Sequence, residues 1–350
     1  MSTSHHRRPR QLTAVDLFCG AGGLSVGLQA AGFTVLGAVE IADTAARAYR
    51  LNHPDTVVWE HNIRTLSPAL VLETLGMRPG ELDLLAGCPP CQGFSTMRSL
   101  RQSTSVSDKR NSLIAQFGRY VEVMRPRALM MENVPGLSAD PRLDRLKKRL
   151  TRLGYLLTCG VLDAADYGVP QRRRRFVMVG MLGQQVPFAR PISRRRTVRE
   201  AIGWLLPPHL SPDPLQSHGE HRSPAVERRI AAVPTNGGSL NDAGDEHGLD
   251  CHRRTKGFYD VYGRMAWDAV APTITSGCVN PSKGRFLHPD ENRSITLREA
   301  ALLQTFPRDY RFPLGDGKYH VAELIGNALP PTFVACHARE LAKALRHTRA

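Results

Sequence analysis

Short apolar runs alternate with amphipathic helical patterns through the first half of the chain. The apolar runs predict strands over residues 12–18, 34–39, 56–60, 82–86, 128–131 and 176–181. Between them, apolar positions recur at helical spacing and predict helices over 24–31, 44–51, 113–124 and 143–153. Strands that alternate with helices in this way are typical of an α/β fold, in which a mainly parallel sheet carries helices on both faces.

The pattern changes after residue 183. Residues 184–272 are rich in proline, glycine, histidine and arginine and show little periodicity, although helices are predicted over 197–206 and 225–233. Regular spacing returns at 297–304 and in a terminal helix over 331–346. We therefore predict four parts, which are a basic arm over 1–11, a large domain over 12–183, a small irregular domain over 184–272, and a C-terminal segment over 273–350 that returns to the large domain.

The charge balance favours a polyanionic partner. Lysine and arginine together number 47 against 32 aspartate and glutamate residues, which gives a formal net charge of +15. DNA or RNA is the first candidate for such a partner, and a basic soluble protein without one is the alternative. The 7 cysteines are scattered, no apolar run is long enough to span a membrane, and the start of the chain lacks the apolar core of a secretory signal. These features predict a cytoplasmic protein with free thiols.

A glycine-rich turn follows the first predicted strand. Residues 16–23 read Asp-Leu-Phe-Cys-Gly-Ala-Gly-Gly, and glycines in such a turn let a ligand approach the backbone closely. Glu40 ends the second predicted strand, where an acidic side chain can hold the hydroxyls of a ribose. The pattern predicts a nucleoside-bearing cofactor, with a tight turn that binds nothing as the alternative. Because the spacing is not that of a dinucleotide-binding GxGxxG loop, a dehydrogenase is disfavoured.

A thiol comes directly after two prolines at the end of the strand predicted over 82–86. Cys91 follows Pro89 and Pro90, and proline fixes its φ angle and offers no backbone donor, so the chain leaves the strand stiffly. A cysteine at this position projects from the carboxyl edge of the sheet, where open α/β folds bind ligands. A buried structural cysteine is the alternative interpretation.

Further motifs follow these two in order along the chain. They are Glu132-Asn133-Val134, Gln171-Arg172-Arg173-Arg174-Arg175, Arg298-Glu299-Ala300, Gln304-Thr305-Phe306-Pro307 and Gly326-Asn327-Ala328-Leu329-Pro330. With Pro89-Pro90-Cys91-Gln92, the series resembles the cytosine-C5 DNA methyltransferases of the bacterial restriction–modification type. The resemblance implies a Rossmann-like S-adenosylmethionine-dependent methyltransferase fold, with 12–183 as the catalytic and cofactor-binding domain and 184–272 as a small, irregular target-recognition domain.

The resemblance also implies the catalytic residues. Carbon 5 of cytosine is a poor nucleophile, and addition of a thiolate at carbon 6 activates it; the family pattern gives this role to Cys91 rather than Cys88. Glu132 would protonate or hydrogen-bond ring nitrogen 3. Arg173 would contact the carbonyl oxygen of the base, and Arg175 would support the site by ion pairing.

S-adenosyl-L-methionine is the implied methyl donor. Asn62 stands where the family often has aspartate, so any contact with the adenine amino group there would lack charge. The implied cofactor-binding residues are Phe18, Gly20, Gly22, Gly23, Glu40, Ile41, Asn62, Ile63, Pro90, Asn327 and Ala328.

Double-stranded DNA is the implied substrate, with the target cytosine flipped out of the helix. Residues 96–111 are polar and similar to the mobile loop that closes over DNA in this family. The residues expected to contact DNA are Ser95, Arg110, Arg253, Arg254, Lys256 and Thr273. No metal is expected, because Cys251, His252, Cys278 and His288 lack a metal-binding spacing.

Two other functions stay open at this point. An RNA-directed cytosine-C5 methyltransferase would share most of these motifs, and a catalytically inactive DNA-binding paralogue would share the fold. The insert at 184–272 and Gly93-Phe94-Ser95 argue against the first. Intact Cys91, Glu132 and Arg173 argue against the second. We expect a monomer in the bacterial cytoplasm, with a cognate restriction endonuclease acting on the same DNA sequence without stable contact.

Overall fold

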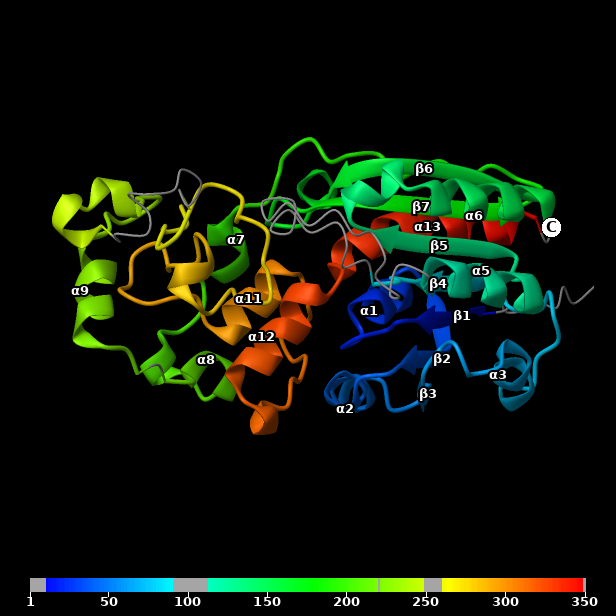
Figure 1. The fold of residues 1–350 in the computed structure, drawn as a ribbon, viewed down its shortest axis with the longest axis horizontal. Coiled ribbons are helices and arrows are strands. Elements are labelled where there is room, and N and C mark those ends of the chain that lie inside the picture. Colours follow the sequence, from blue (N-terminus) through cyan, green and yellow to red (C-terminus); the bar gives the residue numbers. More distant parts are fainter. Residues whose placement is uncertain (1–10, 91–112, 220, 249–259, 349–350) are drawn as a thin grey trace, which may run out of the picture.

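The computed structural model describes residues 11–90, 113–219, 221–248 and 260–348. Its strands form one seven-stranded sheet in the order β3-β2-β1-β4-β5-β7-β6 (Figure 1). All neighbours pair in parallel except β7, which runs antiparallel to both β5 and β6. The strands are β1 (Leu12–Leu17), β2 (Phe33–Glu40), β3 (Val57–Glu60), β4 (Leu84–Gly87), β5 (Ala128–Asn133), β6 (Tyr155–Asp163) and β7 (Arg174–Leu182).

Helices cover both faces of this sheet. One face packs against α1 and α13, and the other packs against α3, α5 and α6. The mainly parallel α/β architecture predicted from the sequence is therefore confirmed. The α-helices of the described residues are α1 (Gly23–Ala30), α2 (Asp43–Asn52), α3 (Pro68–Thr74), α5 (Leu113–Met124), α6 (Pro141–Arg152), α7 (Val198–Ile202), α8 (Pro214–Ser217), α9 (Pro224–Ala232), α11 (Leu297–Leu303), α12 (Lys318–Asn327) and α13 (Pro331–His347).

Every predicted strand is present, and its ends agree within two residues. The helix predicted over 197–206 is shorter and ends at Ile202, because Gly203 caps it and Pro207 follows soon after. The sequence pattern missed strand β6 and the helices α3, α8 and α12. Strand β6 lies at the edge of the sheet and its residues after Tyr155 are only partly buried or exposed, so it shows no clear alternation of buried and exposed positions.

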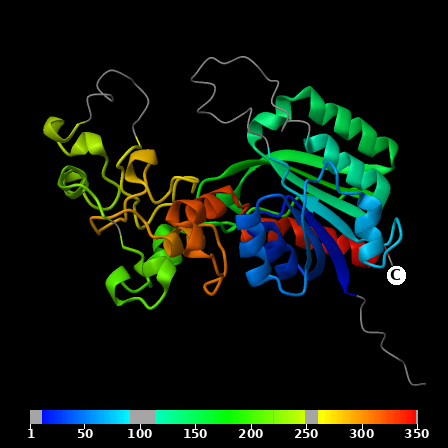
Figure 2. The same cartoon turned by 60° about the horizontal axis from the view of Figure 1, so that its bottom comes forward.

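A second lobe lies beside the sheet, with α11 and α12 at the junction (Figures 1 and 2). Its main core joins α7 and α8 to α11 and α12 in one apolar cluster. From the C-terminal segment, α13 returns to the sheet, where it packs against α1. The predicted boundary at 272/273 crosses a continuous core, because the C-terminal segment supplies most of the buried residues of the second lobe's apolar cluster.

The close contact between α1 and α13 gives a first prediction. A Cβ atom at Gly27 would lie 2.4 Å from Cβ of Val334 and 2.6 Å from the carbonyl oxygen of Pro331. We expect Gly27→Ala to lower the free energy of unfolding by about 1–3 kcal/mol, because the overpacking outweighs the gain in helix propensity. Urea denaturation measures this change. Gly315→Ala is the matched control, since no atom lies within 4 Å of a Cβ there; equal midpoints for the two variants would contradict the prediction.

Candidate active site

The chain turns sharply where β1 gives way to α1. Phe18, Gly20 and Gly22 adopt left-handed φ angles of 61°, 53° and 96°. A Cβ at Gly20 would meet no atom within 4 Å, so a ligand can approach the backbone there. Gly22 and Gly23 are closely packed, since a Cβ at Gly23 would lie 2.6 Å from the carbonyl oxygen of Leu329. Of the three glycines, Gly20 faces open space and the other two allow close packing.

Glu40 ends β2 beside this turn, and backbone amides hold its carboxylate. Oε2 accepts a hydrogen bond from Gly20 N (2.9 Å), and Oε1 accepts from Ile41 N (2.8 Å) and Ala42 N (2.9 Å). Ile41 is a large apolar side chain that is 66% exposed. A fixed carboxylate, an exposed aliphatic side chain and an open glycine fit the ribose and base of a nucleoside, so the residues present fit the predicted cofactor.

The remaining predicted cofactor residues lie in different surroundings. Asn62 follows β3 and is exposed, and its Oδ1 accepts a hydrogen bond from Arg64 N (3.1 Å). Ile63 is 5% exposed and packs in the core under the sheet, which leaves little of its side chain for a ligand. Asn327 is exposed at the end of α12, and the adjacent Ala328 packs close to Gly23. Residues far apart in the sequence thus meet at the glycine turn.

Glu132 and Arg175 form an ion pair near the carboxyl end of β5. Nε of Arg175 lies 2.8 Å from Oε1 of Glu132, and Glu132 is only 8% exposed. Glu132 pairs in register with Val177, so Arg175 lies two residues along β7 on the same face of the sheet. Nη1 of Arg175 donates to the carbonyl oxygen of Arg174 (2.8 Å). The pair therefore presents a carboxyl group and a guanidinium side by side.

Arg173 occupies a different environment from the one the sequence led us to expect. It is 2% exposed, and its Nη1 and Nη2 donate to the carbonyl oxygens of Ile274 and Gly326, at 2.8 Å each. Burial lowers the pKa of this guanidinium well below its ordinary value. The expected contact between Arg173 and a base carbonyl is not supported, because the side chain joins three segments of the protein and Arg175 lies beside Glu132 instead.

The exit from β4 is tied to β5. Asn133 is buried, and its Nδ2 donates to the carbonyl oxygen of Pro89 (2.8 Å), while Pro90 is exposed. Burial first, and the negative charge of Glu132 next, raise the pKa of the Cys88 thiol well above its ordinary value. Cys88 is therefore protonated near neutral pH and is a poor nucleophile. The predicted residues Cys91, Ser95, Arg110, Arg253, Arg254 and Lys256 lie outside the described residues.

Thr273 lies at the start of the C-terminal segment, and its predicted contact with DNA stays a prediction. Its hydroxyl donates to the carbonyl oxygen of Arg172 (2.6 Å). The contact ties the start of the C-terminal segment to the arginine-rich run. Gln171 strengthens the same junction, because its Nε2 donates to Leu303 O (2.9 Å) and to Gln304 Oε1 (2.7 Å).

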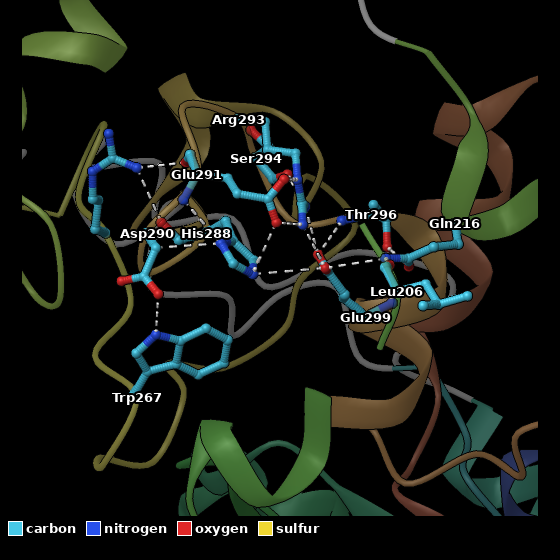
Figure 3. A network of polar contacts seen from close by, with 11 residues as sticks. Leu206, Gln216, Trp267, His288, Asp290, Glu291, Arg293, Ser294, Thr296 and Glu299 are labelled. Atoms are coloured by element: carbon cyan, nitrogen blue, oxygen red, sulfur yellow. Dashed lines mark hydrogen bonds and ion pairs between the residues drawn. The ribbon is translucent and has the colours of Figure 1, made fainter. Parts of the chain in front are cut away.

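A polar network holds the second lobe at the start of α11 (Figure 3). Arg293 donates to both carboxylate oxygens of Glu299 (2.8 Å each) and to Glu291 (2.9 and 3.0 Å). Thr296 and Glu299 form a reciprocal capping box at the helix N-terminus. The Thr296 hydroxyl also donates to Gln216 Oε1 (2.6 Å), which links the 184–272 region to α11. The network fixes the irregular region against the helices that reach the glycine turn.

A second buried network lies under the glycine turn and gives a pH prediction. Ser25 Oγ donates to Asp16 Oδ2 (2.7 Å), and the Tyr49 hydroxyl donates to Ser25 Oγ (2.7 Å). Burial raises the pKa of Asp16 from 3.8 to about 8. At a pH between these two pKa values, Asp16 keeps its proton in the folded protein and loses it in the unfolded chain. The stability contributed by Asp16 is therefore fully present below the unfolded pKa, and it decreases as the pH rises to the folded pKa.

We therefore expect the free energy of unfolding of the wild type to fall, relative to Asp16→Asn, by about 1 kcal/mol per pH unit between about pH 5 and pH 8. Above this range the two curves should run in parallel. Urea denaturation of both proteins from pH 5 to pH 9 measures the difference. Parallel curves across the whole range would show that Asp16 is ionised in the folded protein.

In the part of the chain that the structure describes, no helix combines the length and apolar character needed to cross a bilayer. Across the same residues, no three histidine, cysteine, aspartate or glutamate side chains gather as a metal-binding group.

The fold and the site together define a Rossmann-like methyltransferase. Residues 12–343 match the family model for the C-5 cytosine-specific DNA methylases, and the chain belongs to this family. It is 35% identical to the type II methylase M.HgiDII of Herpetosiphon aurantiacus, over 95% of this chain and 94% of that protein. It is also 35% identical to the type II methyltransferase M1.HphI of Haemophilus parahaemolyticus, over 95% of this chain and 87% of that one.

A solved structure supports the fold independently. A prophage-encoded DNA modification methyltransferase of E. coli superposes with a TM-score of 0.73 at 24% identity, over 95% of this chain and 99% of that chain. The protein is thus an enzyme of the DNA (cytosine-5-)-methyltransferase class, as the motifs predicted, and its relatives are methylases of restriction–modification systems. No motif marked the interior partners Ser25 and Tyr49, and Asn133 was noted only as part of the Glu132-Asn133-Val134 motif, so their contacts near the site become visible only in the structure.

Proposed function

We propose that this enzyme methylates carbon 5 of cytosine within one short sequence of double-stranded DNA, through a covalent bond between Cys91 and carbon 6. The observation that carries the proposal is the Glu132–Arg175 pair, 2.8 Å apart and next to the exit of β4. A carboxyl group and a guanidinium side by side match the ring nitrogen 3 and the carbonyl oxygen of cytosine.

S-adenosyl-L-methionine is the proposed cofactor, and it would supply an electrophilic methyl group. Glu40 would bind its ribose and Ile41 would pack on its adenine, with Gly20 allowing close approach of the backbone. Asn62, which follows β3, and Asn327, which ends α12, are both exposed and complete the proposed set. Phe18, Pro90 and Ala328 are further proposed cofactor contacts, whereas Gly22, Gly23 and Ile63 would support the set from within the protein.

Cys91, Glu132 and Arg175 each have a separate role in the proposed methyl transfer. The Cys91 thiolate would add to carbon 6 of the base, and an electron pair would move to carbon 5. Carbon 5 would then accept the methyl group as its bond to the sulfonium sulfur breaks, with a neutral thioether as the leaving group. Glu132 hydrogen-bonds or protonates nitrogen 3 during the addition, and Arg175 steadies the neighbouring carbonyl oxygen. Loss of the carbon 5 proton to water expels the thiolate and restores the aromatic ring.

DNA binding is proposed on charge and on family membership. The net charge of +15 suits a polyanion, and the proposed DNA contacts remain Ser95, Arg110, Arg253, Arg254, Lys256 and Thr273. Flipping the target base costs a few kcal/mol, which phosphate contacts would offset. We also propose a monomer in the bacterial cytoplasm, with a cognate endonuclease that acts on the same sequence.

Bisulfite sequencing of a plasmid from cells that make the protein tests this function, with Cys91→Ala as the control. Protected cytosines confined to one short motif, and absent from the control, would support the proposal. Uniform conversion in both samples, with soluble protein confirmed, would contradict it. A competition assay between duplex DNA and tRNA then separates the substrates, and a preference for tRNA would identify an RNA methyltransferase.

A further inference from the structure

A tyrosine from the far end of the chain reaches the glycine turn. The Tyr310 hydroxyl donates to the carbonyl oxygen of Ala21, between the two glycines at 20 and 22. Nε2 of His53 lies 3.1 Å from the same hydroxyl and acts as its donor. Tyr310 and His53 are 4% and 3% exposed. Burial lowers the pKa of His53 to about 4, so its imidazole is neutral near pH 7 and can carry the proton on Nε2.

The lack of a side chain at residue 22 makes these contacts possible. A Cβ at Gly22 would lie 2.4 Å from the Tyr310 hydroxyl and 2.6 Å from Nε2 of His53. Phe18 opens the same turn with a left-handed φ of 61°, which is strained for a residue with a side chain. A turn that contains such strain keeps its shape only if its surroundings hold it, and the Tyr310–His53 pair is one such support.

Tyr310 is itself firmly held. Nη1 of Arg298 donates to its carbonyl oxygen (3.0 Å), and Nε of Arg298 contacts Oδ2 of Asp213 in the second lobe (2.5 Å). The Asn52 side chain makes two hydrogen bonds with the backbone of Arg311, the residue after Tyr310. Its Nδ2 donates to Arg311 O (2.8 Å), and its Oδ1 accepts from Arg311 N (2.9 Å). These contacts fix the backbone around Tyr310, so its hydroxyl has a defined position against Ala21.

We propose that Tyr310 is a positioning residue for the cofactor, which holds the Ala21 peptide through a hydroxyl oriented by His53 and so presents Gly20 to the ligand. The inference rests on the proposed S-adenosylmethionine site. Tyr310 touches no reacting atom, so its effect should fall on cofactor affinity rather than on the chemical step.

Tyr310→Phe tests this role, because it removes one hydroxyl and keeps the ring that packs between Phe306 and Phe312. Titration calorimetry with S-adenosylhomocysteine should show binding about tenfold weaker than in the wild type, since a buried carbonyl loses its donor. The KM for S-adenosylmethionine should rise by a similar factor, with kcat changed less than about twofold. Tyr319→Phe is the matched control, because that ring is 57% exposed, and it should bind as the wild type does.

A second pair of variants separates positioning from folding. His53→Gln keeps a donor near the position of Nε2, whereas His53→Leu removes it at similar size, so the Gln variant should bind S-adenosylhomocysteine more tightly than the Leu variant. Equal affinity in wild type and Tyr310→Phe would overturn the inference, as would a fall in kcat without a change in affinity. If the wild type itself fails to bind S-adenosylhomocysteine, the proposed cofactor site is wrong and the inference falls with it.

Discussion

Replacement of Cys91 with alanine is expected to lower the rate of methyl transfer by at least about 10⁴-fold, because no thiolate then adds to carbon 6 of the base. Binding of S-adenosylhomocysteine should change little, since the proposed cofactor contacts come from other residues. Transfer of a labelled methyl group to duplex DNA measures the rate. Trapping on a duplex that contains 5-fluorocytosine should give a covalent adduct with the wild type and none with Cys91→Ala.

Cys88→Ala is the matched control, because it removes a thiol only three residues away. Burial and Glu132 raise the pKa of Cys88, so this thiol stays protonated and its loss should reduce the rate by less than about tenfold. The variant should still form the 5-fluorocytosine adduct. An inactive Cys88→Ala that folds normally, paired with an active Cys91→Ala, would reverse the two assignments.

The sheet could be predicted from the sequence because its inner strands are buried on both faces. Strands β4 and β5 consist of buried residues throughout, and each contains a short apolar run in the sequence, which in β5 covers 128–131 and is followed by Glu132 and Asn133. Edge strand β6 has no such pattern, since most of its residues are partly exposed. The division into domains was less predictable. The second lobe's core joins helices from both sides of residue 272, and this long-range packing leaves no local signal.

The site was predictable where local geometry decides a residue's role. Glu40 ends a strand beside a glycine turn, and the amides that hold it come from the next two residues and from Gly20. Tyr310 was not predictable, because its hydroxyl meets Ala21, a residue 289 positions earlier in the chain. The hydrogen bond from the Thr273 hydroxyl to the carbonyl oxygen of Arg172 was not predictable either, because the two residues lie 101 positions apart.

The two arginines of the Gln-x-Arg-x-Arg motif also have roles that depend on residues far away in the sequence. Residues 173 and 175 are two positions apart in one run of arginines, so the sequence spacing alone cannot separate their roles. The difference comes from distant carbonyls, since those of Ile274 and Gly326 surround Arg173 and leave Arg175 to pair with Glu132. Replacement of each arginine with lysine can therefore distinguish a structural role from a catalytic one.

Arg175→Lys is expected to lower kcat about 10²-fold with a change in unfolding free energy below about 1 kcal/mol. Lysine keeps the positive charge beside Glu132 but loses the planar fork. In the wild type, Nε of Arg175 contacts Glu132 and Nη1 donates to Arg174 O, and we propose that Nη2 contacts the base. One ammonium group cannot serve all three positions. Single-turnover methyl transfer measures the rate at saturating cofactor and DNA.

Arg173→Lys should show the opposite balance, with kcat per folded molecule within about fivefold of wild type and an unfolding free energy lower by about 2 kcal/mol. A single ammonium cannot bridge the carbonyl oxygens of Ile274 and Gly326 as two guanidinium nitrogens do. Burial at position 173 also disfavours the charged form of the side chain there. Urea denaturation of both variants completes the comparison. A catalytic loss in Arg173→Lys at wild-type stability, with full activity in Arg175→Lys, would restore the assignment made from the sequence.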